Sequence, residues 1–368
     1  MNMNFYMPTK VISGKNCISQ NKALFKLGKS CMIVTGATSA IKSGALDDVI
    51  DALCECGIEY IVYDKIRENP LLSTCYDGGV IAREFGCDFV VGIGGGSPMD
   101  AAKAIAGFIA NPDIEPDEIF NIPALNPSVP IILVPTTSGT GSEGNPYSIL
   151  SLDGKDKKQT FNSPYSYARY AFLDYKYTIS LSRNYSLSTA LDAFCHCIES
   201  YMSPKSTEIS RMFALFGAKN IWESFDELDK GDISEQTREA LMYASFAGGV
   251  AINTTGTGFP HPMGYNLTFY ADLPHGRACA VFIGKYVEYQ SKCEEGIKLL
   301  SDFAAYLGTS PDEIARRLPA LAEFTAEIDE ETLTMFADKV KTAGNFANAP
   351  YKVSYDEMME IYKDLFVK

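Results

Sequence analysis

The chain contains only three histidines, His196, His261 and His275, and each stands in a segment that could place it beside a metal ion. Asp192 precedes His196 by four residues in LSTALDAFCHCIES, a helical spacing that puts carboxylate and imidazole on one face. His261 lies at a turn in PHPMG, and His275 follows in LPHGRA. One carboxylate and three imidazoles suit Fe²⁺ or Zn²⁺. We therefore expect these four side chains to form one metal site.

Ordinary structural roles also fit these residues. An Asp–His pair four residues apart is most often a surface pair, and His275 beside Gly276 fits a helix cap. Cys195 and Cys197 flank His196 as alternative ligands, but neighbours on a helix point to different sides. The metal interpretation is favoured because every histidine of a histidine-poor chain stands in a candidate position.

A glycine-rich loop, GIGGGSPMD at 92–100, begins at the end of the apolar run 88–93. Consecutive glycines let the backbone approach a phosphate. Ser97 is predicted to cap the next helix, with Pro98 at its first position and Asp100 three residues after the cap. Such a helix start binds anions. The loop is a candidate pyrophosphate site, although a tight strand-to-helix turn explains the same residues and the strict dinucleotide fingerprint is not met.

A second loop, VPTTSGTGSE at 134–143, carries five hydroxyls and two glycines within ten residues. Its hydroxyls can bond phosphate or ribose, and a capped polar loop is the alternative. Both loops follow expected strands of one sheet, and open α/β sheets bind ligands along that edge. Together the two loops favour a bound dinucleotide.

The first half of the chain alternates short apolar runs with helical patterns. The predicted strands are 31–35, 59–63, 88–93, 130–134 and 170–173, and the predicted helices are 44–57, 72–85 and 98–110. This alternation predicts a parallel sheet covered on both faces. The opening segment 5–19 is expected to form a hairpin on the sheet's edge.

The second half reads as helical from about residue 186. The predicted helices are 187–202, 207–227, 235–253, 281–305, 311–323, 331–343 and 354–366. At roughly 150 residues per domain, the length suggests two domains. We predict an α/β dinucleotide-binding domain at 1–180 and an all-helical domain at 181–368 that binds metal and substrate, with a cleft between them.

Composition excludes several classes of function. Acidic residues outnumber basic ones by 46 to 32, a net charge of −14 that disfavours nucleic acid and anionic membranes as partners. No apolar stretch approaches the roughly 20 residues of a membrane helix, and the start lacks the pattern of a secretion signal. Ten dispersed cysteines indicate reduced thiols. We therefore expect a cytoplasmic protein.

Over nearly its whole length the chain resembles the iron-containing, or group III, alcohol dehydrogenases. The resemblance is carried by PTKVISGKN, GGGSPMDAAKAIA, VPTTSGTGSE, LDAFCHCIES and HPMGYNLTFYADLPHGRA. It implies a Rossmann-like domain followed by a helical metal-binding domain, a fold shared with dehydroquinate synthases. It also implies hydride transfer between NAD(P)H and a small primary alcohol or aldehyde, with the metal polarising the substrate oxygen.

By that resemblance the metal ligands are Asp192, His196, His261 and His275, holding Fe²⁺ or Zn²⁺. The implied cofactor contacts are Gly94, Gly95, Gly96, Ser97, Asp100, Thr136, Thr137, Thr140, Ser142, Lys158 and Thr178.

Two positions depart from the family pattern. Gly36 stands where NAD-preferring members often carry an aspartate after the first strand, so no carboxylate repels a 2′-phosphate. Ser39 and Lys42 could contact that phosphate, which favours NADP(H) with NAD(H) possible. Tyr265 stands where many members have a proton-relaying histidine, so a phenol or a water is the candidate relay.

The substrate is less constrained. Phe246, Phe259, Tyr265 and Phe269 either belong to the core or line an apolar pocket suited to butanol and butanal. A polyol dehydrogenase of the same fold is one alternative, and a non-catalytic nucleotide- or metal-binding protein is another. A dehydroquinate synthase fits less well, since few Lys or Arg surround the ligand motifs. We expect a homodimer or a larger homo-oligomer.

Overall fold

The structure is a computed structural model that describes residues 5–154 and 157–367. The chain divides into two compact units. The first contains Tyr6–Leu181 and Ser234–Phe246, and the second contains Ser182–Ile233 and the chain from Ala247 onward, together with Phe5. Within the described residues, no helix is long and apolar enough to cross a membrane.

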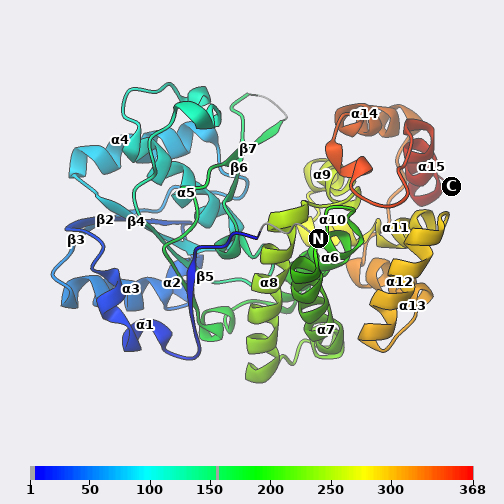
Figure 1. The fold of residues 1–368 in the computed structure, drawn as a ribbon, viewed down its shortest axis with the longest axis horizontal. Helices are drawn as coiled ribbons and strands as arrows, with labels where there is room; N and C mark the ends of the chain where they lie inside the picture. Colours follow the sequence, from blue (N-terminus) through cyan, green and yellow to red (C-terminus); the bar gives the residue numbers. More distant parts are fainter. Residues whose placement is uncertain (1–4, 155–156, 368) are drawn as a thin grey trace. The chain divides into compact units, whose positions relative to one another are not determined.

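The first unit is built on a parallel sheet of six strands (Figure 1). The strands are β1 (Lys10–Ser13), β2 (Ser30–Thr35), β3 (Glu59–Tyr63), β4 (Phe89–Gly94), β5 (Ile131–Pro135) and β8 (Tyr170–Leu173). Their order across the sheet is β1-β8-β5-β4-β2-β3, and every neighbouring pair is parallel. The predicted α/β class and parallel sheet are confirmed.

Helices bury both faces of this sheet. On β2, Met32 and Val34 face a core shared with α4 (Leu72–Phe85) and α5 (Gly96–Ala110). Cys31 and Ile33 face the opposite core, which α1 (Cys17–Gln20) and α3 (Ala45–Glu55) complete. Each fully buried side chain of this size contributes about 1.5–3 kcal/mol. The uninterrupted apolar run of β2 therefore reflects a strand covered on both sides.

The direction in which strands are added reverses between β2 and β4. The chain places β3 on one side of β2 and then β4 on the other. Thr35 pairs with Ile93, so both strands end at the same edge, where Gly36 follows β2 and Gly95 follows β4. Open α/β sheets bind ligands outside this switch point.

One local prediction for this unit is wrong, and one pair of strands was not predicted. Segment 5–19 forms no hairpin, because β1 pairs in parallel with β8 and then leads into α1 through Asn16, whose φ is 61°. An unpredicted antiparallel hairpin joins β6 (Tyr147–Ser151) to β7 (Lys158–Asn162). Its strands are short and mostly polar, so the sequence gives only a weak strand signal.

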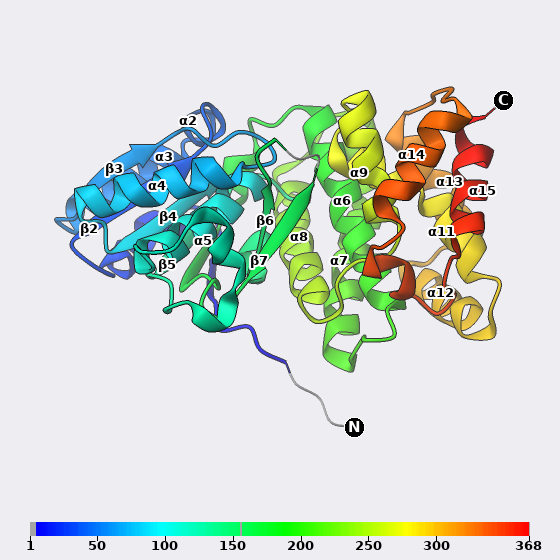
Figure 2. The same cartoon turned by 90° about the horizontal axis from the view of Figure 1, so that it is seen from above.

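The longer elements of the second unit are all helices. They are α6 (Arg183–Met202), α7 (Glu208–Lys230), α9 (Pro260–Ala271), α10 (His275–Ala280), α11 (Ile283–Gln290), α12 (Glu294–Leu307), α13 (Pro311–Ala322), α14 (Glu330–Val340) and α15 (Tyr355–Phe366). Helix α8 (Glu235–Thr255) begins in the first unit and ends in this one. Helix α6 packs against α7, α10, α12 and α13. Figure 2 shows α6 running beside α7.

The sequence placed one helix at 281–305, where the structure has two, α11 and α12. The break lies before Cys293, whose thiol caps α12 by accepting the N–H of Gly296. Helices α9 and α10 were not predicted, because prolines and glycines interrupt the helical pattern there. Pro260 in fact occupies the first turn of α9, where its missing N–H costs nothing.

Candidate active site

Helix α6 presents Asp192, His196 and Glu199 on one face, at intervals of four and three residues. All three residues are buried. Burying ionisable groups together is costly unless they pair with each other or bind an ion. This face of α6 is therefore the starting point of the site.

Helices α9 and α10 bring the other two histidines to this face. His261 lies in the first turn of α9, and His275 begins α10. Helix α10 approaches α6 so closely that a Cβ added at Gly276 would lie 1.8 Å from the backbone oxygen of Ser188. Glycine at this position allows the contact that places His275 beside Asp192.

Three imidazoles converge on one carboxylate oxygen. The Nε2 atoms of His261, His275 and His196 lie 3.6, 3.7 and 3.8 Å from Oδ1 of Asp192. These distances are too long for good hydrogen bonds. Ligand atoms about 2.1 Å from one tetrahedral ion lie about 3.4 Å apart. The spacing therefore suits a shared ion better than direct contact.

Two buried polar atoms at the centre of this group of side chains lack hydrogen-bond partners among the described residues. They are Oδ1 of Asp192 and Nε2 of His261. Leaving such an atom unsatisfied costs about 1–3 kcal/mol. A divalent cation would satisfy both atoms, so these residues fit a metal ion. We call Asp192, His196, His261 and His275 the metal cluster.

The electric field of the cluster favours a cation. Burial opposes ionisation of Asp192, but the imidazoles of His196, His275 and His261 hold its pKa below the ordinary value. Burial lowers the pKa of His261, yet the carboxylates of Glu199 and Asp192 outweigh this effect and raise it to about 10. A positive charge at this position is thus stabilised, and a metal ion supplies one.

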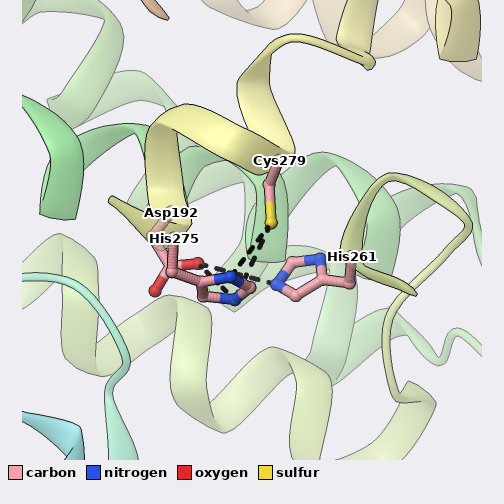
Figure 3. Close-up of side chains that lie close together, drawn as sticks. All are labelled: Asp192, His261, His275 and Cys279. Atoms are coloured by element: carbon pink, nitrogen blue, oxygen red, sulfur yellow. Dashed lines mark hydrogen bonds and ion pairs between the residues drawn. The ribbon is translucent and has the colours of Figure 1, made fainter. Parts of the chain in front are cut away.

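Sequence reasoning missed Cys279, which lies one turn after His275 on α10. Asp192, His261, His275 and Cys279 have donor atoms within 4.8 Å of one another (Figure 3). His196 lies outside that tighter group, although its ring stacks on His261 with centroids 4.8 Å apart. The sulfur of Cys279 is 3.7 Å from both ring nitrogens of His275, so it does not approach Nε2 alone. We interpret it as a packing contact.

The cluster is most accessible at His275, whose side chain is 29% exposed, against 6% for Asp192 and 4% for His261. The ring of Tyr265 stacks on His275 with centroids 5.2 Å apart. A proton relay through the Tyr265 hydroxyl stays a prediction. Of the other aromatic residues considered for the pocket, Phe259 packs in the core against Tyr286, and Phe269 is about half exposed.

The glycine-rich loop of the first unit turns into its helix earlier than predicted. Helix α5 begins at Gly96, and Gly95 rather than Ser97 occupies the cap position. Gly94 has a φ of 150°, which lets the chain enter the helix two residues sooner. Ser97 therefore lies in the first turn, where its hydroxyl accepts the N–H of Asn69 at 3.2 Å.

The hydroxyl-rich loop packs directly on the glycine-rich loop. A Cβ added at Gly96 would lie 2.7 Å from Thr140, and one added at Gly95 would lie 3.2 Å from Thr137. The N–H of Thr136 donates to the backbone oxygen of Gly94 at 2.9 Å. Within the described chain, the buried Thr136 hydroxyl has no partner. The two loops thus form one surface at the ends of β4 and β5.

A buried lysine that the sequence analysis overlooked ties this surface to α5. Lys103 is fully buried, and its Nζ donates to the Ser142 hydroxyl, the Ser142 backbone oxygen and the Tyr147 backbone oxygen at 2.6–2.8 Å. Asp100 accepts the Ser142 hydroxyl at 2.6 Å and the Ile149 N–H at 3.0 Å. We call Asp100, Lys103, Ser142 and Tyr147 the lysine cluster.

This arrangement engages Asp100 and Ser142, two predicted cofactor contacts, within the protein. Their direct contact with a cofactor stays a prediction. Burial lowers the pKa of Lys103 to about 8, although the carboxylates of Asp100 and Glu143 act in the opposite direction. Burial likewise raises the pKa of Glu143 to about 7. The lysine cluster and the neighbouring Glu143 thus hold ionisable groups away from water.

The remaining predicted cofactor contacts lie in several elements of the first unit. Lys158, on β7, donates to the side-chain oxygen of Asn69 at 2.7 Å. Thr178 is buried and donates to the Tyr175 backbone oxygen at 2.8 Å. Gly36 and Ser39 follow β2 at the switch point. These roles also stay predictions.

Two models of one protein family match the two halves of the chain. Residues 8–175 match the family model described as iron-containing alcohol dehydrogenase, and residues 186–366 match the C-terminal model of the same family. The chain belongs to the iron-containing alcohol dehydrogenase family. It is thus a metal-dependent oxidoreductase acting on alcohols or aldehydes, and its family uses iron and a nicotinamide cofactor.

Individual relatives cover most of the chain. The NADPH-dependent butanol dehydrogenase of Clostridium saccharobutylicum is 29% identical over 79% of this chain and 74% of that protein. The 1,3-propanediol dehydrogenase of Citrobacter freundii is 28% identical over 99% and 97%. An iron-containing alcohol dehydrogenase structure from Thermotoga maritima is 31% identical, covers 99% of each chain and has a TM-score of 0.90.

Proposed function

We propose that the protein interconverts small primary aldehydes and alcohols with NADP(H), using one divalent metal held by Asp192, His196, His261 and His275. The observation that carries this proposal is the convergence of three Nε2 atoms within 3.8 Å of a buried carboxylate oxygen that lacks a hydrogen-bond partner among the described residues. Fe²⁺ is the proposed metal and Zn²⁺ the alternative.

The metal, when bound, acts as a Lewis acid that polarises the substrate oxygen and stabilises charge there by several kcal/mol. The chain's own residues supply the rest. Asp192 contributes the anionic donor, and its burial among helices keeps water away from that carboxylate. His275 marks the accessible side of the cluster, where a small substrate can approach. The hydroxyl of Tyr265, stacked on His275, is the proposed group that holds or passes the proton.

The nicotinamide cofactor is proposed to bind at the switch point of the sheet. Its proposed contacts are Gly36, Ser39, Gly94, Gly95, Gly96, Ser97, Asp100, Thr136, Thr137, Thr140, Ser142, Lys158 and Thr178. The absence of a carboxylate at Gly36 supports NADP(H) over NAD(H). The NADPH dependence of the butanol dehydrogenase relative also supports it.

Comparing kcat/KM for NADPH and NADH tests this preference. We expect the value to be higher with NADPH. We further expect Gly36→Asp to lower kcat/KM for NADPH about tenfold relative to NADH, because its carboxylate would repel the 2′-phosphate. A strong preference of the unaltered enzyme for NADH would contradict the proposal.

The substrate test compares two classes. We expect butanal to be reduced by the Fe²⁺-loaded enzyme, prepared anaerobically, and this turnover to stop when a chelator removes the metal. The propanediol dehydrogenase relative supports polyols as a second candidate. Turnover of glycerol or 1,3-propanediol, with none of butanal, would favour that alternative.

We also propose that residues 1–180 bind the dinucleotide and that residues 181–368 bind the metal and the substrate. The positions of the two loops in the first unit and of the metal cluster in the second support this division. A cytoplasmic location and a homodimer or larger assembly are further proposals. Ten free cysteines support a reducing compartment.

A further inference from the structure

Glu199 lies on the opposite side of His261 from Asp192. Both of its carboxylate oxygens are close to Nδ1 of His261, at 2.8 and 2.9 Å. Oxygen Oε2 also accepts the backbone N–H of Gly258 at 2.5 Å. The Glu199 side chain is fully buried. This carboxylate is therefore enclosed in the protein, with the His261 ring as its neighbour.

The contact determines which nitrogen of His261 faces the metal cluster. A histidine nitrogen that donates its proton to a carboxylate cannot also bind a metal, so the other nitrogen must be the ligand. Here Nδ1 faces Glu199, whereas Nε2 points to Oδ1 of Asp192 at 3.6 Å. Helix α6 thus supplies both the proposed ligand carboxylate and, seven residues later, the carboxylate that orients a second ligand.

We propose that Glu199 is a positioning residue of the metal site, which holds the His261 ring so that Nε2 is presented to the metal and makes that nitrogen a stronger donor. This inference rests on the metal ligands given under Proposed function. Carboxylates that accept the second N–H of a ligating histidine typically change metal affinity by about 10–100-fold. Placing a carboxylate here, away from water, would otherwise be costly.

The substitution Glu199→Gln tests the role while nearly preserving shape. A glutamine has one acceptor oxygen and one donor NH₂. If its oxygen accepts from Gly258, its NH₂ faces Nδ1 of His261 and drives the ring proton to Nε2, which blocks the ligand. If its oxygen accepts from His261 instead, two buried donors face each other at Gly258. Either outcome weakens the metal site.

The experiment measures Zn²⁺ and Co²⁺ dissociation constants by competition with a chelator. We expect Glu199→Gln to weaken both affinities about 10–100-fold. Glu199→Asp keeps the carboxylate on a shorter side chain, and we expect its affinities to lie between those of the unaltered protein and Glu199→Gln. Ser200→Ala is the matched control. Ser200 is the next residue on α6 and is buried, and its hydroxyl contacts Thr255 at 2.9 Å. We expect this control to bind metal as the unaltered protein does.

A second measurement needs no variant at Glu199. With only three histidines, ¹⁵N-histidine NMR of the Zn²⁺-loaded protein resolves each ring. We expect His261 to carry its proton on Nδ1. Zn²⁺ bound through Nδ1, or a Glu199→Gln variant that binds metal as tightly as the unaltered protein, would overturn the inference. An unaltered protein that binds no metal would instead overturn the proposed function.

Discussion

The metal cluster and the lysine cluster each contain a buried carboxylate near nitrogen-bearing side chains, but they differ in how many of their polar atoms have hydrogen-bond partners. In the lysine cluster, Lys103 donates to three oxygens at 2.6–2.8 Å, and both oxygens of Asp100 accept hydrogen bonds. In the metal cluster, the imidazoles stop 3.6–3.8 Å from Asp192. The protein itself supplies hydrogen-bond partners in the lysine cluster, whereas Oδ1 of Asp192 and Nε2 of His261 in the metal cluster have none among the described residues.

This difference separates scaffolding from chemistry within one chain. A buried polar network with every partner present fixes backbone, and here it joins α5 to the hydroxyl-rich loop. A buried group left open is destabilising, so it persists where a ligand supplies the missing partner. Removing one group from the metal cluster should therefore affect metal binding, and removing one from the lysine cluster should affect folding.

The largest expected effect follows from His275→Ala in the metal cluster. Losing one ligand should abolish tight metal binding and lower kcat/KM for aldehyde reduction by at least about 10³-fold, since the metal contributes several kcal/mol. Folding should be largely retained because the His275 side chain is partly exposed. Metal content by mass spectrometry and steady-state kinetics measure these effects.

The matched control is Cys279→Ala, one turn further along α10. We interpret the Cys279 thiol as a packing contact on the His275 ring, so this variant should keep its metal content. If Cys279→Ala lost the metal as fully as His275→Ala, the thiol would be a ligand and the assignment of the cluster would have to change.

The lysine cluster should respond in the opposite way. Lys103→Met removes the buried cation and leaves Asp100 without it, so the free energy of unfolding should fall by about 3–5 kcal/mol. Metal bound per folded chain should stay unchanged. Urea denaturation measures the first quantity, and the double variant with Asp100→Asn should recover part of the loss. A free energy of unfolding left unchanged by Lys103→Met would contradict a stabilising role for the lysine cluster.

The smallest effect is a pH dependence at Glu143, the buried acid that follows Ser142. Burial raises its pKa to about 7 in the folded protein, above the ordinary 4.5. Between these values the folded state holds a proton that the unfolded state has lost, so this group makes stability fall as pH rises. Glu143→Gln removes that loss. The variant's stability relative to the unaltered protein should therefore improve from pH 5 to pH 8, as measured by urea denaturation at each pH. A stability difference that stays constant over this range would contradict a raised pKa of the buried Glu143.

Much of the architecture could be predicted from local patterns. Strand and helix alternation is set by side-chain periodicity, which the sequence shows directly, and the parallel sheet follows from it. The proximity of Asp192 to the three histidines was also predictable, because the chain has so few histidines and because Asp192 and His196 are separated by one helical turn.

What the sequence could not show depends on contacts between distant segments. Lys103 sits in the apolar pattern AAKAIAG, and only its partners 39 and 44 residues away explain why it is buried. Glu199 gave a usable signal, since it lies on the same helical face as Asp192, but its partner His261 is 62 residues away. The early start of α5 goes with the φ of Gly94, 150°, a conformation that glycine permits but does not require.

We propose that Asp192 and the three imidazoles hold one divalent ion on which turnover depends. The most direct test is to titrate metal-free protein with Fe²⁺ under anaerobic conditions while following loss of NADPH absorbance with butanal. We predict that turnover rises with added Fe²⁺, levels off at one ion per chain and disappears when a chelator is added. Turnover that needs no metal, or that the chelator leaves intact, would contradict metal-dependent catalysis by this site.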